Sequence, residues 1–564
     1  MKKFIVIFMA IVILVLVFFE CVMIIRYGVA PSNKDLPQFQ YQYIDIYKDF
    51  FKKERRKEGI FYVPQRAFNN SEEFLMDKPL NELRIFIIGG SVGHNFGGNP
   101  FFKNELKRIL PDGDIKVVPC AMGAYDSYRA YLVEKEILAY NPDLIIVFSG
   151  NNEFYNVVKV DVLKYRLDKI FKKSWVYQKL QEQFLKFTGE SGSQYRSRKQ
   201  RLVDYEKNLH LITQAAKNKK IPVILCTLPV NFADCAPFGI RPVDKEYLLA
   251  HYLFDQKGYK GAIGAINSFL DNNPENTFGL YLLANCYRQL AEYDKARVCY
   301  HKALDLSFGS GRASIESNKI VRSVCDEESV LLADIEKEFI SQASEGLLGR
   351  EQFSDNCHWY RECNYLAVKV IIQTFLKSKV ANISDEQADF SIVVSDFPSL
   401  EKRGTRSDEI EGAIKRAAFE SLRLPGGILE RAVEYFETVY LMNPDALWNI
   451  QNIRERTENN LLNDDWLGGY LVDFNWSLVF YYIGETYRRL GMYPESLEYF
   501  NKSINLDEDP QDYRLYIGKA LVYDALGDSQ NAWKNIHEAE NISEKQEILY
   551  YKDIICLPDL KDEE

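Results

Sequence analysis

Acidic residues outnumber basic ones, so the chain lacks the charge of a nucleic-acid-binding protein. Its 564 residues include 70 Lys and Arg against 80 Asp and Glu, which gives a net charge of -10 at pH 7. This balance leaves no basic footprint for a phosphate backbone. The patterns G-x-G-x-x-G and G-x-x-x-x-G-K-S/T are also absent, so we expect neither a dinucleotide-binding turn nor a P-loop.

The ten cysteines lack the spacing of a metal or redox centre. None forms a C-x-x-C motif, so we expect no metal, no cofactor and no dithiol redox site. In an oxidising compartment, Cys357 and Cys363 are candidates for pairing with each other or with Cys325, although the sequence leaves the connectivity open. We expect most of the cysteines to be buried thiols.

The composition is not that of a disordered chain. Hydrophobic residues make up 47% of the sequence and aromatic residues 14%, which is enough apolar surface to form packed cores. A chain of this length holds two or more such cores. We therefore expect a folded protein with several domains.

One long apolar run is present, at the amino terminus. Residues 4–25 are apolar except for Glu20, and a helix of this length spans roughly 33 Å, enough to cross the hydrocarbon layer. Lys2 and Lys3 precede the run and no small-x-small cleavage site follows it, which favours an uncleaved signal anchor, residues 1–26, over a cleaved signal peptide. We expect a single-pass transmembrane helix with the bulk of the chain extracytoplasmic, in the periplasm or at the cell surface.

A connecting segment, residues 27–80, follows the predicted anchor and is rich in Tyr, Phe and Lys. Its charged run at residues 52–57 is interpreted as a solvated helix face. The positive charges of this run lie beyond the apolar segment and weigh against the orientation given above.

Short apolar runs then alternate with amphipathic helical patterns, the clearest of which is residues 126–140. Strands this apolar are buried on both faces, and the helical patterns between them are long enough for right-handed crossovers. We therefore predict an α/β fold with a parallel sheet in three layers. The predicted strands are residues 84–89, 115–118, 144–148, 223–227 and 330–334.

Between the fourth and fifth predicted strands the pattern changes to a helical repeat. Ala262 and Ala296 lie 34 residues apart, and small or apolar residues recur around them at matching offsets. This is the period of the tetratricopeptide repeat (TPR), in which small residues let the two helices of a unit approach closely. Residues 241–310 are thus predicted to be an inserted TPR pair, which divides the sheet domain into residues 81–240 and 311–380.

A second helical block completes the chain. Residues 480–500 correspond to residues 516–536 at a spacing of 36, and a half-match at residues 432–444 predicts one further repeat. Residues 381–564 are therefore predicted to be an all-α TPR-like domain. Repeats of this kind first bury one another, and the concave surface that they form is a candidate site for protein partners.

Three of the predicted strands end in small and polar residues. The first runs into Gly89-Gly90-Ser91, a setting that exposes a hydroxyl at the sheet edge, although the same pattern also describes an ordinary turn. The third ends in Gly150-Asn151-Asn152-Glu153, where the Asn152 amide could donate to an oxyanion or simply cap a turn. The second ends in the loop 119–127, where the Ala124 N–H is a further candidate donor and Asp126 or Ser127 a helix cap.

A histidine follows an aspartate at a spacing that suits a catalytic base. Asp355 lies three residues before His358, so its carboxylate can hold one ring nitrogen while the other faces a serine hydroxyl. Of the six histidines, four fall within predicted helices. The rival is His94, three residues after Ser91, which could instead line a pocket or cap a turn.

In this order the motifs resemble those of the SGNH (GDSL-type) hydrolase family, and more narrowly those of membrane-anchored bacterial SGNH proteins with TPR repeats. The serine, glycine, asparagine and D-x-x-H blocks fall at residues 89–91, 119–127, 150–153 and 355–358, and the phrase Leu228-Pro229-Val230-Asn231-Phe232 adds to the likeness. The resemblance implies a set of roles. They are nucleophile Ser91, base His358, orienting acid Asp355, and an oxyanion hole of the Ser91 N–H, the Ala124 N–H and the Asn152 side chain.

The chain departs from this family at three positions. Gly90 stands where the serine block usually has Asp, Ala124 where a Gly is expected, and Glu153 where an Asp commonly follows the asparagine. None of these changes removes a catalytic atom. Together they are compatible with two alternatives, a pocket that is narrowed or a pocket that is no longer catalytic.

The resemblance implies a serine esterase or O-acyltransferase that acts on an acylated carbohydrate outside the cytoplasmic membrane. Its partners would be that substrate, proteins bound by the TPR repeats, and the membrane. The alternative hypothesis is a membrane-tethered TPR scaffold in envelope or polysaccharide assembly, whose SGNH-like domain binds a ligand without turnover.

Overall fold

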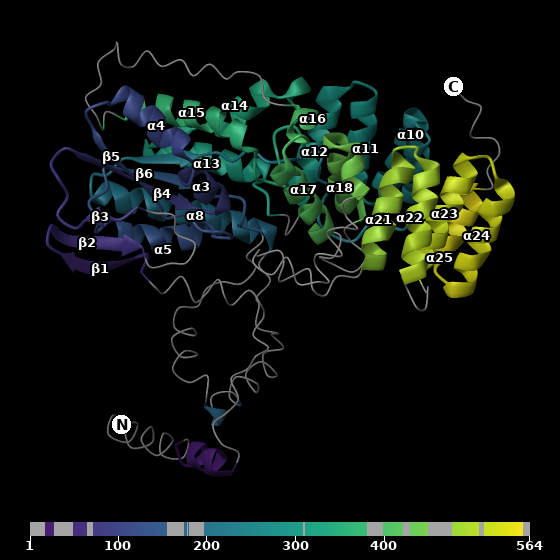
Figure 1. Ribbon diagram of the computed structural model, residues 1–564, viewed down its shortest axis with the longest axis horizontal. Coiled ribbons are helices and arrows are strands. Elements are labelled where there is room, and N and C mark those ends of the chain that lie inside the picture. Colours follow the sequence, from purple (N-terminus) through teal and green to yellow (C-terminus); the bar gives the residue numbers. More distant parts are fainter. Residues whose placement is uncertain are drawn as a thin grey trace.

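A sheet domain and two blocks of helical repeats form the body of the protein (Figure 1). The computed structural model describes the residues of the following ranges. They are 17–26, 49–64, 72–154, 174–176, 179, 197–307, 311–378, 380, 399–420, 429–448, 476–506 and 512–555.

The main sheet has five parallel strands in the order β5-β4-β6-β7-β8. All five predicted strands are confirmed, with boundaries within three residues of those expected. The strands are β4 (Glu82–Gly89), β5 (Asp114–Pro119), β6 (Leu144–Phe148), β7 (Val223–Cys226) and β8 (Leu331–Ala333).

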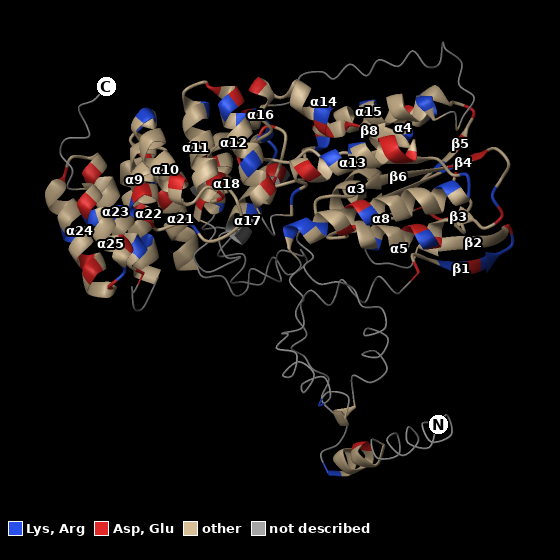
Figure 2. Cartoon of the chain, turned by 180° about the vertical axis from the view of Figure 1, so that it is seen from behind, with Lys and Arg blue, Asp and Glu red and all other residues tan. Residues whose placement is uncertain are grey.

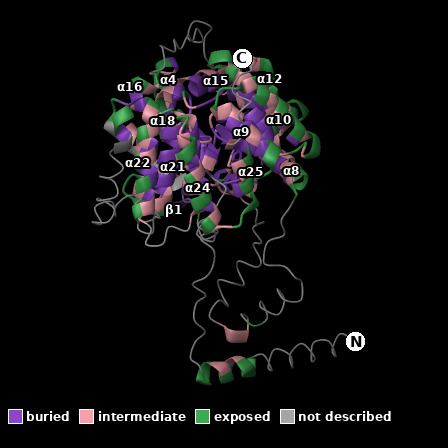
Figure 3. Ribbon diagram, turned by 90° about the vertical axis from the view of Figure 1, so that its right-hand side faces the viewer, coloured by how far each residue is buried: buried purple, intermediate pink, exposed green. Residues whose placement is uncertain are grey.

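Successive side chains of β4 point to opposite faces of the sheet, as the pleat requires. Ile85 and Ile87 join one apolar cluster and Phe86 and Ile88 join the other. Helices cover both clusters, which confirms the predicted α/β sandwich. Figure 3, in which the helical repeats face the viewer, shows buried residues between these helices and exposed residues on the outside. On the Ile85 side lie α3 (Ser91–Gly97), α4 (Pro100–Ile109), α14 (Ile335–Gln342) and α15 (Asn364–Lys377), and on the Phe86 side α5 (Ser127–Ile137), α8 (Arg198–Asn218) and α13 (Ile315–Glu328).

The charged run at residues 52–57 is a strand, so its interpretation as a helix face was wrong. Strand β1 (Phe51–Arg56) pairs with β2 (Gly59–Pro64), and β2 pairs with β3 (Phe74–Leu75), in a small antiparallel sheet. Cross-strand pairing decides the structure here, because Phe51 is buried while the charges face solvent along an edge strand. Charge pattern alone does not reveal such a partner strand.

The described part of the amino terminus is a helix at residues 17–26. Residues 4–16 of the predicted transmembrane run lie outside the described residues. Within the ranges given above, no helix combines the length and the apolar character needed to cross a membrane. The anchor stays a prediction.

The inserted block, between β7 and β8, consists of two helical hairpins. Ala262 and Ala296, whose spacing predicted the repeat, are both fully buried in the second helix of their hairpins. The helices are α9 (Lys245–Asp255), α10 (Tyr259–Asn272), α11 (Thr277–Gln289) and α12 (Tyr293–Leu306).

The carboxyl-terminal block continues the same architecture. Its hairpins pair α17 with α18, α21 with α22 and α23 with α24, and α25 packs on the last of them. The half-match at residues 432–444 corresponds to α18, where Ala432 and Phe436 are fully buried. The helices are α16 (Leu400–Arg403), α17 (Ser407–Glu420), α18 (Leu429–Met442), α21 (Trp476–Arg489), α22 (Tyr493–Leu506), α23 (Tyr513–Ala525), α24 (Ser529–Ile542) and α25 (Gln546–Ile555).

The two repeat blocks, which are distant in the sequence, share one core. Helices α9, α10 and α11 belong to the same apolar cluster as α23, α24 and α25. Buried polar bonds add to this contact, because Arg488 Nη1 lies 2.8 Å from Asp255 Oδ2 and the Tyr252 hydroxyl donates to Asp524 Oδ2 at 2.8 Å. In the view of Figure 2, basic and acidic residues intermix over this helical unit and over the sheet domain.

The described cysteines are free thiols and most of them are buried, as expected. The suggested pairing of Cys357 or Cys363 with Cys325 does not occur. Cys325 belongs to the cluster on the Phe86 side of the sheet, whereas Cys357 and Cys363 belong to the cluster on the opposite side. The sheet therefore separates these thiols, and Cys357 and Cys363 are not bonded to each other either.

Candidate active site

Ser91 is placed at the carboxyl edge of the sheet by the two glycines before it. Gly89 ends β4 with φ +126°, and a Cβ there would lie 1.9 Å from the Phe148 carbonyl oxygen of β6. Only glycine tolerates both the conformation and the close approach. The Gly90 N–H donates to the same carbonyl at 2.9 Å, and Ser91 begins α3, half-buried.

His358 lies between Ser91 and Asp355. Its Nε2 is 2.7 Å from Ser91 Oγ, and its Nδ1 is 2.7 Å from Asp355 Oδ2. Because the carboxylate can only accept, we place the ring proton on Nδ1, which leaves Nε2 to accept from the serine hydroxyl. The other carboxylate oxygen, Oδ1, accepts from the backbone N–H groups of Cys357 at 2.9 Å and His358 at 2.7 Å, which fixes the turn that carries the ring.

The charges of this pair reinforce each other. Burial by itself would raise the pKa of Asp355, but the adjacent His358, the positive charge of Arg416 and the backbone bonds hold that pKa well below its usual range. Burial likewise would lower the pKa of His358, but the Asp355 carboxylate outweighs it and raises that pKa well above the ordinary value. Asp355 is therefore ionised at neutral pH, as the orienting partner of a base must be.

Asn152 and Gly90 are in close contact beside Ser91. The Asn152 amide donates to the Tyr125 carbonyl oxygen at 3.0 Å, and a Cβ on Gly90 would lie only 2.7 Å from Asn152 Nδ2. A carboxamide nitrogen carries two N–H groups, so one remains for a substrate oxygen. Because Gly90 has no side chain, it leaves room for the Asn152 amide.

Ala124, the residue that stands where the family has glycine, has φ +60°. This left-handed conformation costs an L-residue roughly 1–2 kcal/mol, which explains why glycine is expected there. The structure keeps the backbone turn that the motif requires while adding a methyl group. The roles of Ala124, Asn152 and the Ser91 N–H in an oxyanion hole stay a prediction.

Glu153 ties the end of β6 to the start of α5. Its carboxylate accepts from the Ser127 N–H at 2.8 Å, from Ser127 Oγ at 2.8 Å and from Ser149 Oγ at 3.1 Å. Burial and the charge of Asp126 raise the pKa of Glu153 to about 7. Asp126 caps α5 through the Arg129 N–H at 3.0 Å, as the sequence allowed. Glu153 thereby fixes the loop that carries Ala124, a role that its motif alone does not indicate.

His94 does not take the place of His358 in this arrangement. Its Nδ1 lies 3.3 Å from the Ala121 carbonyl oxygen, whereas the ring nitrogen that contacts Ser91 Oγ belongs to His358. Of the two candidate bases, His358 has the required geometry.

The carboxyl-terminal block also reaches this site, which no sequence motif indicated. The fully buried Arg403 of α16 lies over the Tyr360 ring at 3.8 Å from its centroid and donates to Glu362 Oε2 at 2.8 Å. Both partners follow His358 within four residues. The carboxyl-terminal block thus contacts the segment that follows His358, through Tyr360 and Glu362.

One group of potential metal ligands occurs in the described part of the chain. Donor atoms of Asp355, Cys357 and His358 lie within 4.8 Å of one another. Because Asp355 Oδ2 and His358 Nδ1 bond each other, we attribute this group to the pairing of acid and base.

Two family models match the repeats. Residues 241–303 match the model described as anaphase-promoting complex, cyclosome, subunit 3, and residues 479–510 match the tetratricopeptide repeat model. The first segment holds α9 to α11 and most of α12, and the second overlaps α21 and α22. The chain therefore carries helical repeats of this type in both blocks. No curated protein matches the chain.

Solved structures similar to the chain include a GDSL-like lipase from Bacteroides thetaiotaomicron, with 10% identity and a TM-score of 0.26, covering 52% of this chain and 88% of that one. The acetyl xylan esterase AlAXEase is 14% identical with a TM-score of 0.27, covering 51% and 98%. The acetylxylan esterase Axe2 from Geobacillus stearothermophilus is 12% identical with a TM-score of 0.26, covering 52% and 93%. Likenesses at this level carry no argument about chemistry.

Proposed function

We propose that this protein is a serine esterase or O-acyltransferase that forms an acyl-enzyme on Ser91. The observation that carries the proposal is the pair of 2.7 Å hydrogen bonds that join Ser91 to His358 and His358 to Asp355. A hydroxyl bonded to an imidazole that a carboxylate orients is an activated nucleophile.

The reaction follows from these contacts. Ser91 Oγ attacks an ester carbonyl while its proton passes to His358 Nε2, and the resulting imidazolium is stabilised by Asp355. The negative oxygen of the tetrahedral intermediate is held by Asn152 and by the backbone N–H groups of Ser91 and Ala124. His358 then protonates the leaving alcohol, and water or a sugar hydroxyl takes the acyl group from Ser91.

The substrate in this proposal is an acylated carbohydrate outside the cytoplasmic membrane. Support for the location is the apolar run at residues 4–25 with Lys2 and Lys3 before it. Support for the substrate class is the resemblance of the four motifs to membrane-anchored SGNH proteins. The repeats would bind protein partners on surfaces outside the core that the two blocks share.

The test uses the full chain in detergent with an aryl acetate and a fluorophosphonate probe. We expect turnover and a covalent adduct on Ser91, both abolished in Ser91→Ala. Turnover that persists in Ser91→Ala contradicts the assignment of the nucleophile. Absence of both turnover and adduct in the wild type favours the scaffold hypothesis, in which the sheet domain binds ligand without reaction.

A further inference from the structure

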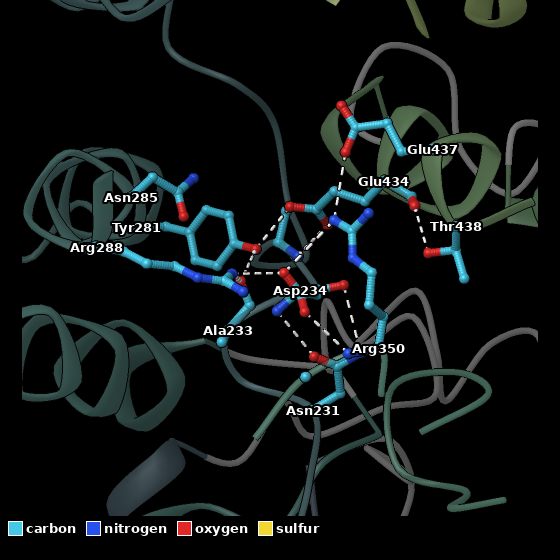
Figure 4. A network of polar contacts seen from close by, with 12 residues as sticks. Asn231, Ala233, Asp234, Tyr281, Asn285, Arg288, Arg350, Glu434, Glu437 and Thr438 are labelled. Carbon is cyan, nitrogen blue, oxygen red and sulfur yellow. Dashed lines mark hydrogen bonds and ion pairs between the residues drawn. The ribbon is translucent and has the colours of Figure 1, made fainter. Parts of the chain in front are cut away.

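The loop that follows β7, residues 227–238, joins the segment of Asp355 to the repeats by hydrogen bonds, and Figure 4 draws its residues Asn231, Ala233 and Asp234. The Asn231 N–H donates to the Asn356 carbonyl oxygen at 3.1 Å, and Asn231 Nδ2 contacts the Asp355 carbonyl oxygen at 3.3 Å. Arg312 Nη1 in turn donates to the Asn231 carbonyl oxygen at 2.8 Å. Asn231 therefore fixes the backbone from which the Asp355 carboxylate projects.

Asp234 holds Asn231 in this position. Its N–H donates to Asn231 Oδ1 at 2.9 Å, and its buried carboxylate accepts from Arg288 Nη1 of α11 at 2.6 Å and from the Arg350 N–H at 2.9 Å. A Cβ at Gly349 would lie 2.1 Å from Asp234 Oδ2, so the absence of a side chain there makes room for the carboxylate. Burial would raise the pKa of Asp234, but Arg350 and Arg288 hold it well below its usual range.

The carboxyl-terminal block bonds to the same loop. Glu434 of α18 accepts from the Tyr281 hydroxyl at 2.6 Å and from the Ala236 N–H at 2.7 Å, as Figure 4 shows for the tyrosine. Arg350 Nη2 lies 3.3 Å from Glu437 Oε2 of the same helix. Both repeat blocks thus meet the loop within five residues of Asn231.

A buried set of charges is a costly way to hold two modules together, because apolar side chains of similar volume often give equal or greater stability. The repeat blocks already share an extensive apolar core. What charged hydrogen bonds add is fixed geometry at the point where the loop meets Asp355. The network is therefore better explained by a role in aligning the site than by a role in holding the sheet domain and the repeat blocks together.

We propose that Asp234 is a positioning residue, which is anchored by Arg288 of the inserted repeats and by Arg350, and which fixes Asn231 so that Asp355 is aligned with His358. This inference rests on the proposed function of Ser91. It makes the repeats a working part of the active site, so that a contact that shifts α11 also shifts the orienting acid.

The test compares Arg288→Gln with Arg297→Gln. Both arginines lie on the inserted repeats with similar side-chain exposure, 36% and 33%, but Arg297 pairs with the exposed Asp294 and not with Asp234. Three quantities are measured: the NMR titration of the His358 ring in protein with labelled histidine, the rate of fluorophosphonate labelling of Ser91, and the melting temperature. The His358 signal is identified by its loss in His358→Gln.

We expect Arg288→Gln to lower kcat and the labelling rate roughly 10-fold, with KM changed less than about twofold, and to move the His358 titration to lower pH while the protein stays folded. Arg297→Gln should leave all three quantities as in the wild type, and Arg288→Lys should restore part of the loss. An unshifted His358 titration and unchanged kcat in folded Arg288→Gln would overturn the proposal.

The titration separates this proposal from the proposed function. If the wild type neither hydrolyses the aryl acetate nor reacts with the fluorophosphonate probe, the proposed function fails. A His358 titration that shifts in Arg288→Gln and not in Arg297→Gln still supports the positioning role. If Arg288→Gln unfolds, Arg288→Met, which keeps the apolar stem and removes the charge, decides in its place. A folded methionine variant with an unshifted titration overturns the role, and one with a shifted titration supports it.

Discussion

His358 Nε2 lies 2.7 Å from Ser91 Oγ, although 267 residues separate the two in the chain. The intervening segment includes four strands of the sheet and the whole inserted repeat pair. The parallel order of the sheet brings Ser91, at the end of β4, to the edge where loops of an α/β fold form sites. The segment of His358 reaches the same edge because the loop after β7 and α16 hold it there.

Replacement of Asp355 by Asn should remove the charge that supports the base. In the wild type, the raised pKa of His358 keeps the ring protonated at mildly acidic pH, so kcat/KM should rise with pH through a midpoint above 6.5. Asp355→Asn should lower kcat by about 10³- to 10⁴-fold, the loss seen when the acid of a Ser-His-Asp triad is replaced, and should move the midpoint to lower pH. A pH–rate profile that keeps its midpoint in Asp355→Asn contradicts the pairing.

Replacement of Asn152 by Ala should affect kcat, whereas replacement of its neighbour Asn151 by Ala should affect the free energy of unfolding. Loss of a single oxyanion donor costs about 3 kcal/mol in the transition state, so Asn152→Ala should lower kcat by about 10²- to 10³-fold and leave the melting temperature nearly unchanged. Asn151 Oδ1 instead accepts from the buried Ala313 N–H at 2.8 Å. Asn151→Ala should therefore lower the free energy of unfolding by about 1–3 kcal/mol. Steady-state kinetics and thermal unfolding of both variants check this, and equal loss of kcat in the two would count against the oxyanion role.

A methyl group at Gly90 should displace Asn152. The Cβ would lie 2.7 Å from Asn152 Nδ2 and 3.2 Å from the Tyr125 carbonyl oxygen, so the amide has to move. A shift near 1 Å at a reacting group costs up to about 10²-fold in rate, and we expect Gly90→Ala to lower kcat by roughly 10- to 100-fold. The matched control is Gly123→Ala in the same region, where a Cβ meets nothing within 4 Å. Equal activity of Gly90→Ala and the wild type would show that Asn152 does not act from its present position.

Much of the sheet domain could be predicted because its signals are local. Each strand is a continuous apolar run, and the 34-residue spacing of Ala262 and Ala296 reports a helix contact that recurs within the chain. The same holds for Asp355 and His358, whose contact spans three residues. The prediction of a helix face at residues 52–57 was wrong because the structure of β1 depends on a partner strand and not on its own charges.

The supports of the site could not be predicted, because each is a contact between segments that share no spacing rule. Arg403 stacks on Tyr360 from 43 positions away in the sequence, and Asp234 meets Arg350 across the inserted repeats. In the sequence, an arginine that is buried in the folded protein cannot be told from a solvated surface charge, because its partner is not known. Glu153 was visible in its motif, but its bonds to Ser127 depend on how α5 docks onto β6.

Glu134 should make the stability of the sheet domain depend on pH. Its side chain is fully buried in α5, and neither carboxylate oxygen has a hydrogen-bond partner among the residues that the structure describes. Burial raises the pKa of Glu134 to about 9. Between the unfolded value, near 4.5, and 9 the folded state keeps a proton that the unfolded state has lost, so the free energy of unfolding falls as pH rises through this window.

Glu134→Gln removes this titration while it keeps the shape of the side chain. We expect the variant to be more stable than the wild type by on the order of 3 kcal/mol at pH 7. The two should be of nearly equal stability at pH 4.5, where the glutamate is protonated in the folded state and about half protonated in the unfolded state. Urea unfolding at the two pH values checks this, with Glu246→Gln on the exposed face of α9 as the control. A stability difference between Glu134→Gln and the wild type that does not grow with pH would mean that Glu134 is ionised in the folded protein and has a partner in solution.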